Sequence, residues 1–135
     1  MEGANLSGIN MMGGYFAAGS LCKTNLSESC LIGFDFKGKG LEEANFSNAD
    51  LTGACLWSAF LNDANLSSCI LKGVNMRNAI LYNANLRGAV LDSANLANVD
   101  FTGADFAIDR YMTGILFWNT TMPDGTVIEG PCFIN

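Results

Sequence analysis

The chain repeats one large apolar residue every five positions, with no insertion. In steps of five from Leu6 to Phe106, all 21 positions hold Leu, Met or Phe, and the residue two positions earlier is usually small. This step suits no α-helix, because successive large side chains would turn by about 140° and share no face. On a continuous strand they would alternate between two faces. The chain is therefore predicted to turn a corner every five residues, with the small and the large residue pointing inward.

Residues that recur every twenty positions indicate how many corners complete one coil. One such series is Asn5, Asn25, Asn45, Asn65 and Asn85, ending in Asp105. With four segments in each coil, these residues lie above one another at about 4.8 Å, and their amides can form a hydrogen-bonded ladder. A three-sided coil would scatter the series. The spacing favours four segments per coil.

The segments ANLSG, ADLTG, ANLRG and ADFAI carry a family resemblance. Their pattern A(N/D)LxG resembles the pentapeptide-repeat superfamily over residues 4–108. The resemblance implies an all-β fold, a right-handed quadrilateral parallel β-helix (a solenoid) of about five coils with four pentapeptides per coil. The segment NTTMPDGTV also resembles C-terminal ends of such proteins from cyanobacteria and the chloroplast thylakoid lumen. We expect a β-helix over residues 1–108 and a C-terminal capping segment over 109–135.

The segment GFDFKGKGLEE, residues 33–43, departs from the pattern. Phe34 and Lys39 occupy positions meant for small inward residues, and an unpaired ammonium inside a core is costly. We predict a backbone bulge around Gly38–Gly40 that lets Lys39 reach solvent. A distorted binding notch is the functional alternative.

The repeat weakens after Phe106, where Asp109 takes a small-residue position while Tyr111 and Leu116 keep the five-step count. The Pro-Asp-Gly sequence at 123–125 predicts a turn between two β-prone runs. Apolar residues of these runs are expected to cover the open end of the solenoid. Near the N-terminus no cap is evident, so the first coil either frays or is covered by a second copy in a homodimer.

Charge and composition exclude several classes of protein. The net charge of −6 with only seven Lys and Arg argues against direct nucleic-acid binding. No apolar run approaches the ~18 residues of a membrane span. The start MEGANLSGIN is no secretory signal, although a cleaved precursor stays open.

The cysteines and the missing histidines limit the chemistry. The five cysteines match no zinc pattern, and the chain has no His, so no metal, cofactor or nucleophile–His arrangement is expected. We expect most of the cysteines to be reduced, which favours a cytoplasmic location for the protein. The thylakoid lumen is the alternative if a targeting segment was removed. Cys132 is the one cysteine for which a disulfide stays open.

Three outward columns form a candidate interaction patch. Lys37, Trp57 and Arg77 share one position in successive coils, so both cations could flank the indole. Phe60 with Ile80, and Ile70 with Val90, form two apolar columns. Such columns are typical either of a partner-binding face or of ordinary cross-strand packing.

The resemblance implies several functions rather than one. Members of the superfamily include protein-binding scaffolds, DNA-mimicking protectors of gyrase and a cyanobacterial regulator of heterocyst differentiation. We expect a non-catalytic protein-interaction or scaffold module with an unidentified protein partner. A DNA-mimicking gyrase-binding protein is the alternative, favoured by the acidic pI. An enzyme is a distant third.

The inward series generates a test by substitution. Replacing Leu66 by Asp should lower the free energy of unfolding by several kcal/mol, because it buries an unpaired charge in mid-column. Thermal unfolding followed by circular dichroism measures the change. An unchanged melting temperature would contradict the inward assignment.

Overall fold

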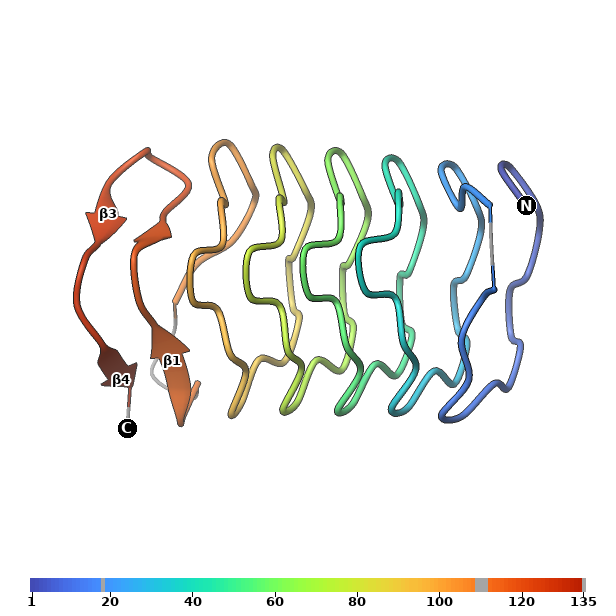
Figure 1. The fold of residues 1–135 in the computed structure, drawn as a ribbon, viewed down its shortest axis with the longest axis horizontal. Coiled ribbons are helices and arrows are strands. Elements are labelled where there is room, and N and C mark those ends of the chain that lie inside the picture. Colours follow the sequence, from blue (N-terminus) through green and yellow to red (C-terminus); the bar gives the residue numbers. More distant parts are fainter. Residues whose placement is uncertain (18, 109–111, 135) are drawn as a thin grey trace.

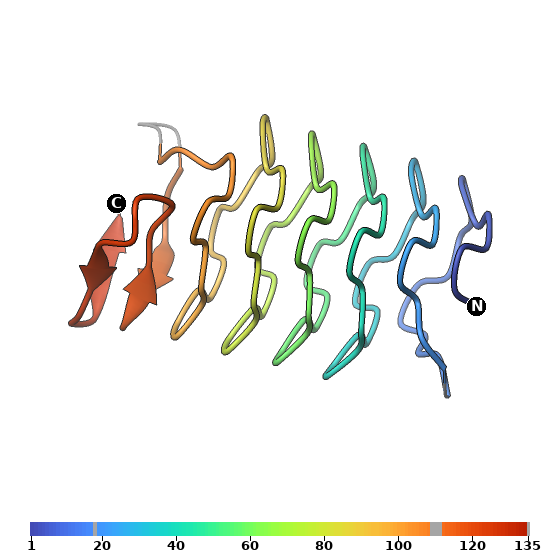
Figure 2. The same ribbon diagram turned by 90° about the horizontal axis from the view of Figure 1, so that it is seen from above.

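The chain folds as an all-β solenoid whose coils stack along one axis (Figure 1). The structure is a computed structural model and describes residues 1–17, 19–108 and 112–134. These residues contain no helix. The two termini lie at opposite ends of the stack, as a view from above also shows (Figure 2). Sixteen parallel bridges join residues exactly one coil, or twenty positions, apart, from Asn5–Asn25 to Asn85–Asp105.

Each five-residue segment from residue 1 to 105, apart from 16–20, combines one bridge with one tight turn. The bridging residue donates its N–H to the preceding coil and the next residue donates to the following coil, as in Asn25 N to Ala4 O (2.8 Å) and Leu26 N to Asn45 O (2.7 Å). A turn follows, closed for example by Ala44 N to Leu41 O at 3.0 Å. Its third residue has positive φ, here Glu43 at 58°. The backbone groups of one coil are thus satisfied by its two neighbours.

The predicted inward residues form the core. All 19 large residues of the series from Phe16 to Phe106 are at most 8% exposed. Every residue two positions before them is also buried from Ala44 to Ala104. Full burial of each Leu or Phe contributes about 1.5–3 kcal/mol, so the stack is stabilised along its whole length. Leu6 and Met11 in the first coil are only partly buried.

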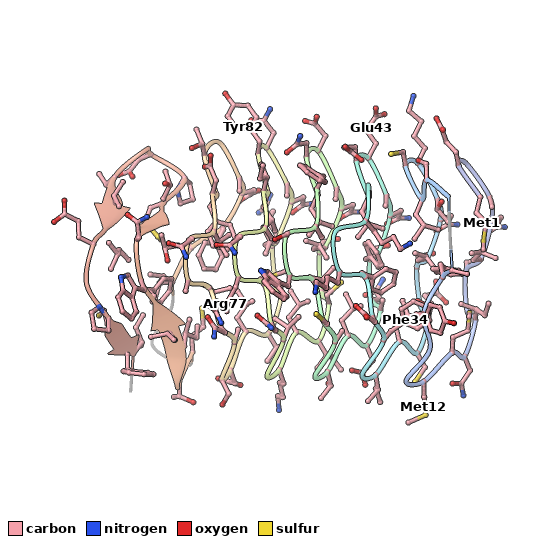
Figure 3. The ribbon with its side chains drawn as sticks, viewed as in Figure 1. Met1, Met12, Phe34, Glu43, Arg77 and Tyr82 are labelled. Atoms are coloured by element: carbon pink, nitrogen blue, oxygen red, sulfur yellow. The ribbon has the colours of Figure 1, made fainter. Side chains whose placement is uncertain are left out.

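Phe34 fits into its small-residue position without distortion (Figure 3). Gly14 lies one coil earlier, and a Cβ atom there would come within 2.8 Å of the Phe34 ring. The missing side chain makes room for the phenyl ring, which is fully buried and packs against Phe16 and Phe36 at centroid distances of 5.1 and 4.5 Å. The two neighbouring coils therefore compensate each other.

The predicted bulge around Gly38–Gly40 is wrong. Lys39 N donates to Phe36 O at 3.0 Å, which closes a regular turn, and Gly40 bridges Phe60 in register. Lys39 itself is half-buried. The backbone around Gly38–Gly40 therefore keeps the regular path of the repeat.

The predicted asparagine ladder is confirmed. The side-chain amide of each Asn donates to the Oδ1 of the Asn one coil earlier, at 3.1 to 3.3 Å, from Asn25 through Asn45 and Asn65 to Asn85. Each Oδ1 also accepts the backbone N–H two residues later, as in Ser67 N to Asn65 Oδ1 at 3.1 Å. The ladder is thus continuous and ties each side chain to its own turn.

Four short strands complete the C-terminal end: β1 (Ile115–Phe117), β2 (Thr120–Thr121), β3 (Val127–Ile128) and β4 (Cys132–Ile134). β1 pairs with β4 and β2 with β3, both antiparallel. The predicted turn lies between β2 and β3, where Gly125 N donates to Met122 O at 2.9 Å. The Thr126 hydroxyl and N–H lower the pKa of the exposed Asp124 carboxyl in this turn.

The five-step count does not extend to Leu116. Leu116 bridges Asn95 and Thr121 bridges Asp100, which are separations of 21 residues. One extra residue therefore shifts the register, so Ile115 and Phe117 point into the core and Leu116 is only half-buried. Asp109 and Tyr111, expected to hold inward positions, lie outside the described residues.

The asparagine ladder predicts what happens when one side-chain amide nitrogen is replaced by an oxygen. Replacing Asn65 by Asp keeps both hydrogen bonds that Oδ1 accepts but sets an oxygen against Asn45 Oδ1, which accepts the Asn65 amide at 3.2 Å. We expect a loss of about 1–3 kcal/mol at pH 7, since a polar partner is left unpaired. The loss relative to the wild type should shrink near pH 3, where a protonated carboxyl can donate. Urea unfolding at both pH values measures it, and an equal loss at both would contradict the ladder's role.

Candidate functional site

The candidate surface begins with one column of turn residues. Gly38 N donates to Trp57 O at 2.8 Å, and Ser58 N donates to Arg77 O at 2.9 Å. These bonds place Lys37, Trp57 and Arg77 at the same turn position of three successive coils. The rigid backbone ladder presents all three side chains outward.

Lys37 and Trp57 are in direct contact. The Lys37 ammonium lies 4.1 Å from the centroid of the Trp57 ring, and the indole remains 38% exposed. Such an exposed cation–π contact contributes about 0.5–1 kcal/mol. Arg77 (labelled in Figure 3) is exposed, and within the described residues it makes no cation–π contact with Trp57. Only one of the two predicted flanking cations therefore stacks on the indole.

Trp118 belongs to the same column, which the sequence pattern did not reveal. Asn78 N donates to Ala97 O at 3.0 Å and Asn98 N donates to Trp118 O at 2.7 Å, so the column continues through both residues. The extra residue in the register hid Trp118 from a five-step count. The residue that follows Trp118, Asn119, could have revealed it. Asn119 occupies the same turn position as Asn98, and both residues have positive φ.

The backbone of Trp118 is held by a buried hydroxyl. Trp118 N donates to Thr120 Oγ1 at 3.2 Å, and this hydroxyl donates to Leu96 O at 2.7 Å. Thr120 is completely buried, whereas the Trp118 side chain is 53% exposed. The second indole is thus presented from a fixed main chain.

The two apolar columns do not form one patch. Phe60 bridges Ile80, and Ile70 bridges Val90, as their spacing predicts. The two pairs are ten residues apart in a coil with a twenty-residue period, so they lie half a coil from each other. Only Phe60 and Ile80 follow the turn that carries Trp57. The seven-residue patch therefore separates into two surfaces.

Acidic residues are unevenly distributed over the turns. The turns that contain Lys37, Trp57, Arg77, Ala97 and Trp118 pair them with Gly38, Ser58, Asn78, Asn98 and Asn119, so this column holds no carboxylate. The other turn columns hold acidic residues, including Glu42, Glu43, Asp63, Glu28 and Asp92. Within the part of the chain that the structure describes, the two ion pairs are Lys23–Glu43 and Arg87–Asp105, and neither involves Lys37 or Arg77.

Two shallow cavities lie near the C-terminal end. One of about 280 Å³ contains the Arg87–Asp105 pair, whose atoms are 3.6 Å apart and largely exposed. The other, of about 370 Å³, is lined by Phe106, Ala107, Ile108, Met122, Pro123, Asp124 and Thr126. The exposed Arg87–Asp105 ion pair in the first cavity contributes about 0.2–1 kcal/mol.

The five cysteines are free and differ in exposure. Cys69 is buried, its thiol donates to Phe46 O at 2.8 Å, and burial raises the pKa of this thiol to about 12. Cys132 in β4 is exposed. Among the described residues no cluster of three or more acidic, Cys or His side chains could hold a metal ion. No helix long and apolar enough to cross a membrane occurs in residues 1–17, 19–108 and 112–134.

These features define a repeat protein with a filled apolar interior and a surface built from outward columns. Comparison with family models matches eight copies of the pentapeptide repeat at residues 41–67 and 69–106. The chain belongs to the pentapeptide repeat family, whose members form right-handed β-helices. Residues 4–17 and 19–40 continue the same coils, although the usual Ala is replaced there by Ile9, Gly14, Gly19, Thr24, Ser29, Phe34 and Lys39.

Several solved structures are similar to this chain. A pentapeptide repeat protein from the Arabidopsis thaliana thylakoid lumen is 30% identical, with 73% of this chain and 68% of that chain covered and a TM-score of 0.42. Rfr23 from the cyanobacterium Cyanothece 51142 is 28% identical over 89% and 88%, with a TM-score of 0.33. QnrB1, a plasmid-mediated fluoroquinolone resistance protein, is 16% identical over 87% and 78%, with a TM-score of 0.38. No curated protein matches this chain significantly.

The thiols provide a test of the burial pattern. Ellman's reagent at pH 8 should modify Cys132 rapidly and Cys69 only after unfolding, because the Cys69 thiolate is scarcely populated and enclosed. A Cys132→Ser variant should lose the fast phase, whereas Cys69→Ser should retain it. Fast modification of Cys69 in the folded protein would contradict the structure.

Proposed function

We propose that this chain is a non-catalytic protein-interaction or scaffold module that binds an unidentified protein partner. The observation that carries the proposal is the exposed column of Lys37, Trp57 and Arg77 on a rigid backbone. Aromatic residues and Arg are enriched in protein interfaces. Fold alone assigns no function, so the proposal depends on these side chains.

A DNA-mimicking gyrase-binding protein is the competing function. The pI of about 4.3 and the elongated shape favour it. The layout of charge opposes it, because the stacked pair Glu43 and Asp63 is partly neutralised by Lys23, whose Nζ lies 3.7 Å from Glu43. The central ladder of amides is neutral. Direct binding of nucleic acid is also not part of the proposed function.

The finer architecture is part of the same proposal. We infer a quadrilateral cross-section of four pentapeptides per coil, about five coils, and a division into a β-helix over 1–108 and a cap over 109–135. Four bridging positions in each twenty residues from 21 to 100 support the four sides. Buried Ile115 and Phe117, with Ile128 and Ile134 packed against the core, support the cap.

A homodimer through the first coil is proposed from its exposed apolar edge. Leu6 and Met11 are only partly buried there. A second copy would cover this edge and pair with its backbone. A monomer mass that stays constant from micromolar to millimolar concentration would contradict the dimer.

We propose a cytoplasmic location, with the thylakoid lumen as the alternative for a processed precursor. Five free thiols support a reducing compartment. Five Asn-X-Ser/Thr sequences support a location outside the glycosylating secretory pathway: Asn5, Asn25, Asn45, Asn65 and Asn119. The amide nitrogens of four of these residues already donate hydrogen bonds, which a glycan would break.

Affinity capture tests the scaffold function. The tagged wild-type chain should enrich a defined partner from an extract of the source organism, and a Leu66→Asp chain should not, since its surface columns are disrupted. Quantitative mass spectrometry compares the two. Enrichment of nothing beyond the Leu66→Asp control would contradict the proposal, and inhibition of gyrase supercoiling by the wild-type chain would favour the DNA mimic instead.

A further inference from the structure

We propose that the turn column from Lys37 to Trp118, with the adjoining Phe60 and Ile80, binds an extended acidic segment of a partner protein that alternates carboxylates with apolar side chains. This inference rests on the proposed scaffold function and deepens it by naming the surface and the chemistry of its ligand. We call this set the indole column: Lys37, Trp57, Arg77, Ala97 and Trp118, flanked by Phe60 and Ile80.

Charge complementarity identifies the occupant. The chain carries a net charge of −6, yet the turns of the indole column hold two cations and no carboxylate. Neither cation takes part in an ion pair among the described residues. Two carboxylates flank the column: Asp35 Oδ1 accepts the Lys37 backbone N–H at 2.8 Å, and Asp100 Oδ1 accepts both the N–H and the hydroxyl of Thr102. A ligand with carboxylates can therefore pair with Lys37 and Arg77 without breaking an ion pair among the described residues, although the Lys37 ammonium also contacts the Trp57 ring.

Apolar exposure along the same column identifies the rest of the ligand. Trp57, Phe60 and Trp118 are 38%, 43% and 53% exposed. Between the indoles lies Ala97, which is only 6% exposed although it occupies an outward turn position. Neighbouring atoms therefore cover most of this small side chain. Trp and Arg are among the residue types that most often dominate binding energy in protein interfaces.

The length of the column sets the length of the ligand. Four coil steps separate Lys37 from Trp118, which is about 19 Å at the spacing of neighbouring strands. An extended chain advances about 3.3 Å per residue, so about six residues cover this distance. In an extended peptide every second side chain points to the same side. In an alternating acidic and apolar hexapeptide the carboxylates therefore share one side and the apolar side chains the other, so the carboxylates can face Lys37 and Arg77 while the apolar side chains face the flanking Phe60 and Ile80.

The experiment uses the full chain and an acetylated, amidated peptide of three Glu-Leu repeats. The only two tryptophans of the chain are Trp57 and Trp118, so intrinsic fluorescence reports on the indole column directly. We expect a saturable change in emission, weakened at least tenfold when salt is raised from about 0.05 to 0.5 M, since the contacting charges are exposed. Isothermal calorimetry gives the affinity independently of fluorescence.

Two matched variants locate the binding site. Arg77→Glu should weaken peptide binding at least tenfold, whereas Lys72→Glu, also exposed and in the same coil but in another turn, should change it less than twofold. Both variants change the net charge equally. Trp118→Ala, measured by calorimetry, should also weaken binding, and the melting temperatures of all variants should match the wild type because these side chains are exposed.

Several outcomes would overturn the proposal. These are no saturable binding up to 1 mM peptide (about 4 kcal/mol of binding free energy), equal loss in Arg77→Glu and Lys72→Glu, or tighter binding of a Lys-Leu control peptide or of single-stranded DNA. Self-association through the column, seen as a rise in mass that Arg77→Glu abolishes, would assign a second copy instead.

Affinity capture separates this surface from the general function. If an Arg77→Glu chain retains every partner of the wild type, the indole column is wrong while the scaffold function stands. If the wild-type chain captures no partner but binds the Glu-Leu peptide with the expected variant pattern, the scaffold function fails and the surface assignment stands.

Discussion

Hydrogen bonds between neighbouring coils are the constraint on which the rest of this structure depends. Asn25 N–H reaches back to Ala4 and Leu26 N–H reaches forward to Asn45, so no coil satisfies its own backbone. An inserted residue would break these pairs and rotate every later core side chain outward. The uninterrupted series from Leu6 to Phe106 follows from that cost. The extra residue before Leu116 is tolerated because the chain completes little more than one coil and then reverses into β3 and β4.

Periodicity made the inward residues and the asparagine ladder predictable, because both depend only on position within the repeat. Phe34 and Lys39 show the limit of that reasoning. Judged within their own coil, both are too large, and a bulge is the natural prediction. The compensation lies twenty residues earlier, where Gly14 leaves the space that the Phe34 ring fills. Packing in a solenoid is thus a property of two coils, and a single segment does not encode it.

The candidate surface was predictable only in part for a similar reason. The shared position of Lys37 and Trp57 followed from the period, and their contact is present. Trp118 was missed because the extra residue before Leu116 moves it out of the five-step count, and the repeat pattern does not contain that shift. Joining Phe60 and Ile80 to Ile70 and Val90 was wrong because similar chemistry was taken for proximity. Half a coil separates the two pairs.

With the same backbone in every coil, recognition has to come from side chains on the outside. The two exposed indoles leave apolar area in water, which favours a covering ligand. Lys37 and Arg77 determine which charge that ligand should carry. A second indole column laid against the first would bring Lys37 and Arg77 close to like charges, so self-association through this surface is opposed. Nucleic acid offers the opposite charge, but the carboxylates of the other turns would repel its phosphates. An acidic peptide small enough to touch only this column avoids both penalties.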